Sequence, residues 1–411
     1  MSLNETPVAD RIHIGIFGNR NAGKSSLLNA ITGQDLAVVS DVAGTTTDPV
    51  SKAMELLPLG PVVLIDTPGL DDTGELGKKR IEKSFLVLRK IDYAVLVIDG
   101  HRTAVTAAEE ELLDVLKKKE LPFVIVINKT DMLQGGQEAM IKSSFREAGL
   151  PVMSVSASTK DGINELKEYI AHDIGTGKNR DLIKDLLNPG DVVVLVTPID
   201  ESAPKGRMIL PQVQTIRDVL DGNAVCVVTK ETDLTHTLNS LKCPPKMVVT
   251  DSQAFKIVDE LTPKSTPLTS FSILFARLKG DLARQVKGVA CIRDLHDGSG
   301  VLISEGCTHH RQCGDIGTVK LPKLLSGFTG KDLKFSFTSG TAYEKDLTGY
   351  DLIIHCGGCM LNDKEMQYRI SEAMRQGVPI TNYGVALAYL TGILPRSLEL
   401  FPERELLCSV K

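Results

Sequence analysis

Three cysteines and two histidines in the C-terminal part of the chain have the side chains and the spacing of a metal site. Cys307-Thr308-His309 is followed, after residues 310–354, by His355-Cys356-Gly357-Gly358-Cys359. The two glycines let the backbone curl round a metal that both flanking thiolates bind. Three thiolates are one fewer than the four that usually close a structural zinc or iron-sulfur site. The residue types therefore predict a metal centre with one open coordination position.

Two metals fit these residue types. Zinc would take His309 or His355 as its fourth ligand, whereas a four-iron cluster would leave one iron exchangeable. Cys313 is an alternative fourth thiolate, since only five residues separate it from Cys307. We interpret the other cysteines, at positions 226, 243, 291 and 408, as packing or loop residues. The expected metal ligands are Cys307, Cys356 and Cys359, with His309 and His355 as candidates for the fourth position.

A second constellation lies near the start of the chain, where glycines precede a lysine and a serine. The run Gly18-Asn19-Arg20-Asn21-Ala22-Gly23-Lys24-Ser25 follows the apolar stretch Ile12–Phe17 and begins a helical pattern. This is the context of a phosphate-binding loop. Its backbone N–H groups face the phosphates, Lys24 adds a positive charge and the Ser25 hydroxyl ligates magnesium. The pattern predicts a site for a nucleoside triphosphate.

Further motifs, each at the end of an expected strand, select the nucleotide. In Asp66-Thr67-Pro68-Gly69, the Asp66 carboxylate can hold a magnesium-bound water while the Gly69 amide approaches the γ-phosphate. In Asn128-Lys129-Thr130-Asp131, the Asp131 carboxylate can accept two hydrogen bonds from guanine, and adenine would leave it unpaired. Ser156-Ala157 fits the last loop that contacts the base. We expect the nucleotide to be GTP.

Alternating strands and helices must position these loops. Strands are expected at 12–17, 62–65, 93–98, 123–127 and 152–155, with helices such as 109–119 and 163–174 between them, which predicts a doubly wound parallel sheet. Later strands at 301–304, 333–337 and 352–354 place Cys307 and His355 after strand ends, where open α/β sheets collect ligands. The expected fold class is α/β, a P-loop GTPase sheet followed by two smaller α/β domains.

Two breaks divide the chain. Residues 175–180 are rich in glycine and polar residues, and residues 262–267 contain two prolines, which block regular pairing. We therefore expect a GTP-binding domain over residues 1–176, a middle domain over 181–262 and a cysteine-bearing domain over 268–411.

Composition narrows the class of protein. The 411 residues include 47 basic and 52 acidic side chains, and this net charge of −5 argues against nucleic acid as a partner. The chain is 42% hydrophobic but only 4% aromatic, which is typical of aliphatic parallel sheets. No apolar run approaches the roughly 18 residues that span a bilayer, and Met1–Arg11 has no basic leader region. We expect a soluble cytoplasmic protein whose cysteines are reduced thiols or metal ligands.

The N-terminal part resembles the potassium-dependent branch of the translation-factor-related GTPases. The resemblance is carried by Asn21-Ala22-Gly23-Lys24-Ser25-Ser26 and Gly44-Thr45-Thr46-Thr47-Asp48. It implies Thr46 as a magnesium ligand and potassium near Asn21, Ser40, Val42 and Thr45. Leu70 stands where Ras-like proteins have a glutamine, so we expect slow hydrolysis in which potassium neutralises charge. The expected catalytic residues are Lys24, Thr46, Asp66 and Gly69, and the expected nucleotide-binding residues are these four with Gly18, Asn21, Ala22, Gly23, Ser25, Ser26, Thr45, Asn128, Lys129, Asp131, Ser156 and Ala157.

A GTPase motif set joined to this Cys-x-His and His-Cys-x-x-Cys pair resembles the FeFe-hydrogenase maturation GTPases, the HydF family, across essentially the whole chain. The resemblance implies a middle dimerisation domain and a C-terminal domain that holds a 4Fe-4S cluster on Cys307, Cys356 and Cys359. It also implies a homodimeric scaffold, which receives a two-iron precursor made with radical-SAM maturation enzymes and delivers it to the FeFe-hydrogenase apoprotein. The alternative is an RNA-modification or ribosome-associated GTPase with a structural zinc. A GTP-gated redox enzyme would need a second cluster or a dinucleotide fingerprint, which the sequence lacks.

Overall fold

The chain forms two compact units, residues 1–178 and 179–411. The structure is a computed structural model that describes residues 8–33, 49–57, 59–71, 81, 83–102, 105–133, 137–175, 181–198, 208–306, 315–340 and 342–409.

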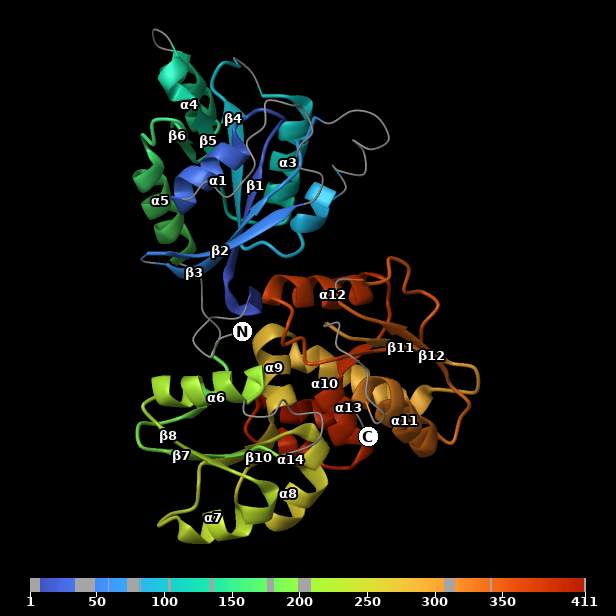
Figure 1. Ribbon diagram of the computed structural model, residues 1–411. Coiled ribbons are helices and arrows are strands. Elements are labelled where there is room, and N and C mark those ends of the chain that lie inside the picture. Colours follow the sequence, from blue (N-terminus) through green and yellow to red (C-terminus); the bar gives the residue numbers. More distant parts are fainter. Residues whose placement is uncertain are drawn as a thin grey trace. The chain divides into compact units, whose positions relative to one another are not determined.

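A six-stranded sheet forms the centre of the first unit, with strand order β2-β3-β1-β4-β5-β6 (Figure 1). Strands β1 and β3–β6 are parallel, and β2 pairs antiparallel with β3 at the edge. The elements are β1 Ile12–Phe17, α1 Lys24–Thr32, β2 Val50–Leu56, β3 Gly60–Asp66, β4 Tyr93–Asp99, α3 Ala107–Lys118, β5 Phe123–Asn128, α4 Gln137–Glu147, β6 Val152–Ser154 and α5 Ile163–Gly175.

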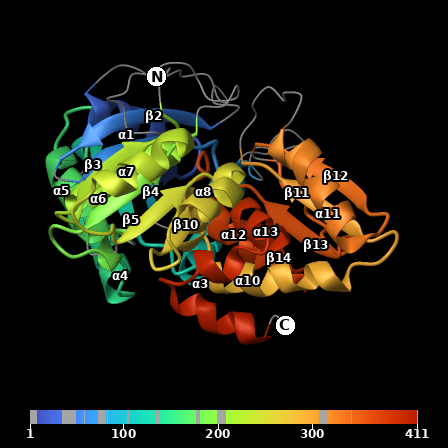
Figure 2. The ribbon, with the colours of Figure 1, turned by 90° about the horizontal axis from the view of Figure 1, so that it is seen from below.

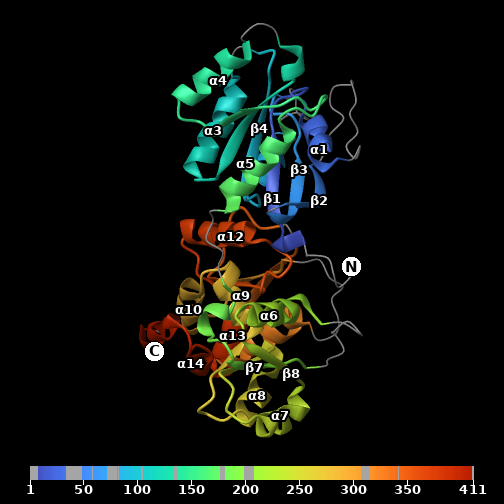
Figure 3. The same ribbon diagram turned by 90° about the vertical axis from the view of Figure 1, so that its left-hand side faces the viewer.

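Helices cover both faces of this sheet (Figure 3). Leucine and isoleucine side chains of α1 and α5 pack on one face, and those of α3, with Phe145 of α4, pack on the other. Because the central strands are buried on both faces, they read as continuous apolar runs, and all five expected strands are present within two residues of their expected bounds. Strand β2 was not expected, because its side chains alternate between exposed and partly buried positions at the sheet edge.

The second unit contains two four-stranded parallel sheets, in the orders β10-β9-β7-β8 and β12-β11-β13-β14. The strands of the latter sheet are labelled in Figure 2. The elements of the first are β7 Val192–Val196, α6 Leu210–Asp221, β8 Val225–Thr229, α7 Leu234–Ser240, β9 Met247–Thr250, α8 Phe255–Leu261 and β10 Leu268–Ser270. Those that follow are α9 Phe271–Lys279, α10 Leu282–Ala290, β11 Gly300–Ser304, α11 Leu321–Thr329, β12 Lys334–Thr338, β13 Leu352–His355, α12 Asp363–Arg375, β14 Ile380–Asn382, α13 Tyr383–Leu390 and α14 Leu394–Ser397.

One hydrophobic core joins these two sheets. It contains Val193 and Leu195 of β7, Val301 and Ile303 of β11, and side chains of α9, α10 and α13. The sheets are therefore two layers of one packed unit, and each supplies one face of a shared interior.

The expected boundary at residues 262–267 differs from the structure. After this segment the chain forms β10, which pairs in parallel with β9 of the first sheet from Leu268 to Ser270. The segment is also attached to α14, because the buried Arg396 guanidinium donates to the carbonyl oxygens of Thr262, Pro263 and Thr266 at 3.1, 2.7 and 3.1 Å. The two prolines mark a tight turn within the unit, and the first sheet ends only at Ser270.

None of the helices within the described ranges is both long enough and apolar enough to cross a membrane.

Candidate functional site

The loop between β1 and α1 has the close backbone packing that a phosphate-binding loop needs. Gly18 has φ +145°, and a Cβ there would lie 2.2 Å from the carbonyl oxygen of Val97. Gly23 has φ +92°, and its Cβ would lie 2.2 Å from the amide nitrogen of Asn128. Only glycine fits both positions, since each combines positive φ with neighbouring atoms that leave no room for a side chain.

Lys24 is held inside this loop. Its side chain is buried, and its ammonium donates to the carbonyl oxygens of Gly18 and Asn19 at 3.0 and 2.8 Å. Both carbonyls belong to the loop itself, so the positive charge is directed into the turn whose amides face a bound phosphate. Three of the predicted loop residues therefore lie together.

Ser25, an expected magnesium ligand, lies beside Asp66, which the sequence suggested as the holder of a magnesium-bound water. The Ser25 hydroxyl donates to Asp66 Oδ2 at 2.6 Å, and Asp66 Oδ1 is buried with no hydrogen-bond partner among the described residues. Burial raises the pKa of Asp66, against the opposing effects of the Ser25 hydrogen bond and the Lys24 charge. A buried carboxylate oxygen without a partner beside a hydroxyl fits a hydrated divalent cation, which would supply the missing positive charge.

Asn128 connects the phosphate-binding loop to the expected base-binding loop. Its side chain is buried and donates to the carbonyl oxygen of Ala22 at 3.0 Å, while its Oδ1 accepts from the Ala157 amide at 3.0 Å. One side-chain amide thus holds two loops that lie at the ends of β1 and β6. The role of Asn128 is to position both loops.

The carboxylate of Asp131 is exposed and oriented by two serines. Ser156 and Ser158 donate to its two oxygens at 2.6 and 3.0 Å. The Ser156 hydrogen bond is the largest contribution to the lowered pKa of Asp131, so this carboxylate stays ionised and can accept from guanine. Lys129, with φ +65°, extends to Asp99 at 2.8 Å. These contacts hold Lys129, Asp131 and Ser156, the residues predicted to bind the base, at one end of the sheet.

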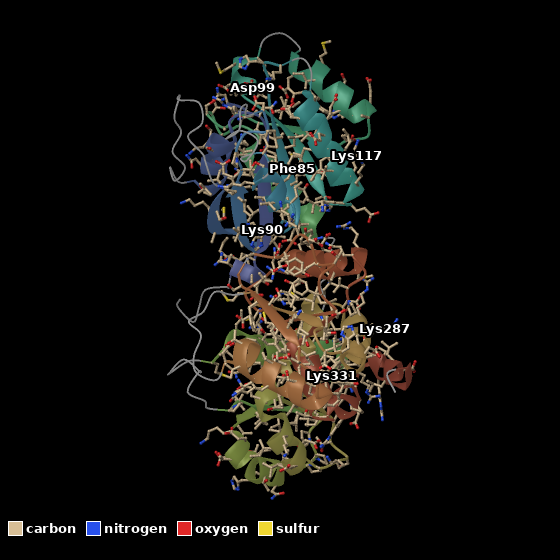
Figure 4. All side chains as sticks on the ribbon, turned by 90° about the vertical axis from the view of Figure 1, so that its right-hand side faces the viewer. Phe85, Lys90, Asp99, Lys117, Lys287 and Lys331 are labelled. Carbon is tan, nitrogen blue, oxygen red and sulfur yellow. The ribbon has the colours of Figure 1, made fainter. Side chains whose placement is uncertain are left out.

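The same edge of the sheet includes groups that the sequence motifs did not indicate. Asp99 ends β4 at this edge, whereas Lys90 lies near the opposite edge (Figure 4). Asn19 donates to Thr106 Oγ1 at 2.9 Å, and Thr106 forms a capping box with Glu109 at the start of α3. The signal for this contact was present in the sequence, because Thr-x-x-Glu before a helical run is the capping-box pattern.

The remaining expected nucleotide residues divide into two groups. Gly69 lies beside the phosphate-binding loop, because the amide of the next residue, Leu70, donates to the Gly18 carbonyl at 3.3 Å. Asn21 is in the loop with φ +61°, and Ser26 is in the first turn of α1. Outside the described residues lie Ser40, Val42, Thr45 and Thr46.

The thiol site lies where β11 and β13 end. These strands pair in parallel, so Ser304 and His355 are register partners and the residues after them leave the sheet together. Cys356 Sγ accepts hydrogen bonds from the amides of Gly306 at 3.0 Å and Gly358 at 3.4 Å. Gly306 directly precedes Cys307, which lies outside the described residues together with His309 and Cys313. The described part of the fold therefore brings the Cys356 thiol to the start of the Cys307 segment.

The chemistry of this thiol suits a metal. Burial raises the pKa of Cys356 to about 11, which the two amide hydrogen bonds oppose. A thiolate here needs a positive partner, and a bound metal ion supplies one. Amide donors to cluster sulfurs are common at iron-sulfur sites, where they adjust the potential. Among the described residues no three His, Cys, Asp or Glu side chains converge as a metal site. Cys356, Cys359 and the candidate ligand His355 are the described members of the expected set.

His355 lies beneath this loop with both ring nitrogens hydrogen-bonded. Nδ1 lies 2.8 Å from the carbonyl oxygen of Cys356, and Nε2 lies 2.9 Å from Arg369 Nη1. Burial, together with the charge of Arg369, lowers the pKa of His355 to about 3. Both ring nitrogens of His355, a candidate fourth ligand from the sequence, therefore have partners within the described residues.

Buried charged groups surround the thiol loop. Lys279, at the end of α9, donates to the carbonyl oxygen of Leu361 at 3.0 Å, just after Cys359. Glu305 is buried next to Gly306 and accepts from the Tyr383 hydroxyl at 3.2 Å. These contacts were not indicated by spacing, because they join residues that are 82 and 78 positions apart in the sequence. They attach the loop to α9 and α13.

Both units match known protein families. The second unit matches the hydrogen maturase F dimerization domain over residues 182–280 and the hydrogen maturase F tetramerization domain over residues 283–400. The first matches the 50S ribosome-binding GTPase family over residues 13–129, and the RsgA GTPase family matches residues 72–207.

Curated relatives are similar to part of this chain. The tRNA modification GTPase MnmE of Chromobacterium violaceum is 38% identical over 165 residues, which cover 40% of this chain and 35% of that protein. GTPase Der of Lawsonia intracellularis is 31% identical over 164 residues, covering 38% and 36%. The chain thus spans about a third of the length of these relatives.

Solved structures with partial similarity include two proteins bound to GDP and AlF4−. Era of Aquifex aeolicus, bound to GDP and AlF4−, has a TM-score of 0.37 at 19% identity and covers 53% of this chain and 93% of its own. NFeoB of S. thermophilus has a TM-score of 0.32 at 24% identity and covers 43% and 69%.

Proposed function

Since this chain belongs to the hydrogen maturase F family, we propose that it is a GTP-hydrolysing scaffold that assembles the two-iron precursor and delivers it to apo FeFe-hydrogenase. The precursor is its cargo, and a 4Fe-4S cluster on Cys307, Cys356 and Cys359 is the proposed resident cofactor. The two matched domains of that family adjoin along residues 182–400.

The hydrogen bond from the Gly306 amide to Cys356 Sγ is the observation that carries this proposal. It joins two loops that are fifty residues apart in the chain and each contain an expected ligand. Three thiolates would leave one iron of a 4Fe-4S cluster without a protein sulfur, and this position is where a cargo group can bind and leave. The protein's contribution is to hold the thiolates, donate amide hydrogen bonds to sulfur and keep the loop attached to β11 and β13.

GTP is the proposed nucleotide, with magnesium beside Ser25 and Asp66. The loop amides and Lys24 would hold the phosphates, and Asp131 would select guanine. We place potassium near Asn21, where its charge would compensate for the missing glutamine at Leu70. Turnover measured in potassium and then in sodium tests this placement, because equal rates in both salts would exclude it.

The proposed partners are a second copy of the chain, the radical-SAM maturation enzymes and the apo-hydrogenase. Residues 182–280 and 283–400 match domains whose names describe dimerization and tetramerization, so homo-oligomers are expected from this unit. The nucleotide state is proposed to alter partner dissociation through the switch loops. Equal partner affinity with GDP, a GTP analogue and no nucleotide would contradict that coupling.

Anaerobic reconstitution with iron and sulfide tests the cluster. The full chain should turn brown and bind about four irons, as a 4Fe-4S cluster requires. Cys359→Ser should lose most of the iron, while Cys243→Ser, which removes an exposed cysteine of the same unit, should retain it. One equivalent of zinc without iron uptake would instead support a structural zinc site. The functional test is incubation of the loaded protein with apo-hydrogenase, followed by measurement of hydrogen evolution.

A further inference from the structure

We propose that Arg369 and His355 are positioning residues, which together hold the Cys356 peptide in place, and that His355 is not a ligand of the metal. The inference rests on the proposed cluster and deepens it, because it assigns roles to two side chains under the thiol loop. It is drawn from the contacts of a single buried guanidinium and the imidazole next to it.

Arg369 lies in α12 and is completely buried. Its Nη1 lies 2.9 Å from His355 Nε2 and donates to Ser304 Oγ at 3.4 Å, and its Nη2 donates to the carbonyl oxygen of Gly340 at 2.8 Å. Ser304 and His355 end β11 and β13, and Gly340 follows β12. One side chain therefore contacts the ends of three adjacent strands of the second sheet.

The charge of Arg369 is balanced inside the protein. Nε donates to Glu365 Oε1 at 3.1 Å, one helical turn away, and the guanidinium lies 5.0 Å from the centre of the Tyr343 ring. Burying a guanidinium is costly unless its donors are satisfied, and these acceptors satisfy all three of its nitrogens. Because its charge is paired, we expect Arg369 to act through the positions of the groups it binds.

The contact with Arg369 determines the tautomer of His355. A guanidinium only donates hydrogen bonds, so Nε2 of the imidazole must be the acceptor. The proton of the neutral ring is therefore on Nδ1, which donates to the carbonyl oxygen of Cys356 at 2.8 Å. A continuous series of contacts runs from Glu365 through Arg369 and His355 to the peptide of Cys356.

This series ends on the residue whose thiol joins the two cysteine loops. The Cys356 carbonyl is held by His355, and its Sγ accepts from the amide of Gly306. For His355 to bind a metal, one ring nitrogen would have to leave its partner. Either a buried guanidinium N–H or the Cys356 carbonyl would then be unpaired, which disfavours ligation. Mutating groups that orient metal ligands typically lowers metal affinity by about 10- to 100-fold.

The first experiment needs no metal. Nitrogen-15 NMR of the metal-free full-length chain, with histidine labelled, reports which ring nitrogen of His355 carries the proton. The resonance is assigned with His355→Asn. We expect the Nδ1–H tautomer, and finding the proton on Nε2 would overturn the proposal. This result is independent of iron, so it is distinct from a failure of the wild-type chain to take up iron, which would contradict the proposed function.

The second experiment compares matched variants after reconstitution. Arg369→Lys keeps the charge but loses the forked geometry, and Arg375→Lys changes an exposed arginine of the same helix. We expect Arg369→Lys to weaken iron retention by about 10- to 100-fold, the range typical of groups that orient ligands, and Arg375→Lys to leave it unchanged. Circular dichroism confirms that each variant is folded. Equal iron retention in the two variants would overturn the role of Arg369.

Electron paramagnetic resonance of the reduced cluster separates positioning from ligation. His355→Asn removes the imidazole but retains an N–H donor near the position of Nδ1. The control is His296→Asn, which changes an exposed histidine. We expect the same nitrogen hyperfine couplings in the wild type and both variants. Loss of an imidazole coupling in His355→Asn alone would show that His355 binds the metal and would overturn the proposal.

Discussion

Replacing Arg396 by methionine should destabilise the second unit without changing the first. Methionine nearly fills the same space but cannot donate, so the variant removes hydrogen bonds and leaves little cavity. In the wild type the guanidinium donates to the Asp259 carboxylate and to the carbonyl oxygens of Asp259, Thr262, Pro263 and Thr266. The variant would leave these acceptors without their donor.

The size of the expected destabilisation depends on which of these acceptors water can reach. Thr262 and Thr266 are 2% and 3% exposed, and their carbonyl contacts with Arg396 are buried, whereas the contacts of Pro263 and Asp259 are only partly buried. A buried acceptor left unpaired costs about 1–3 kcal/mol, so two of them reduce the free energy of unfolding by about 2–4 kcal/mol if the segment relaxes partly toward solvent. For a unit of this size that lowers the melting temperature by roughly 5–15 °C.

Differential scanning calorimetry of the full chain measures the shift, and binding of a fluorescent GTP analogue reports that the first unit is intact. Arg217→Met is the control, because that arginine pairs with Asp221 on the surface and its side chain is 76% exposed. Trypsin gives a local signal: cleavage after Lys264, between the held carbonyls, should accelerate in the Arg396 variant alone. If Arg396→Met shifts the transition no more than Arg217→Met, the proposed attachment of this segment to α14 is wrong.

Three further variants test the sites and the charge pairs. Asn128→Ala should weaken GTP-analogue binding by about 2 kcal/mol, since it leaves the buried Ala22 carbonyl and the partly buried Ala157 amide unpaired, and unchanged affinity would exclude its linking role. Gly18→Ala should abolish nucleotide binding because its methyl group would overlap the Val97 carbonyl, which isothermal titration can measure. Asp185→Asn should destabilise the second unit at neutral pH, because the Arg277 hydrogen bond lowers the pKa of Asp185 in the folded protein. The ionised Asp185 therefore stabilises the fold above the ordinary aspartate pKa of about 3.9. This stabilisation is lost as the pH falls through the lower pKa of the folded state. Urea unfolding curves of this variant and the wild type should therefore converge in acid, and a constant difference would contradict the pairing.

Local sequence patterns were enough to predict which described residues of the candidate nucleotide site lie at one end of the first sheet. The phosphate-binding loop follows β1, and Asp66 and Asn128 end β3 and β5. Parallel strands bring their carboxyl ends to one edge of a sheet whatever the rest of the chain does. The family resemblance was likewise carried by short motifs, and the family matches confirm it. The proposed cluster ligands remain a prediction based on those motifs.

Only the tertiary structure decided which groups hold these motifs in place. The prolines near residue 262 predicted a domain boundary, but β10 returns to β9 and Arg396 holds the turn from more than a hundred residues away. His355 had the same motif context as a metal ligand, yet Arg369 engages one ring nitrogen and the Cys356 carbonyl the other. Residue type and spacing determine what chemistry a side chain can perform. Whether its lone pairs are free depends on buried partners from distant elements, which no local pattern encodes.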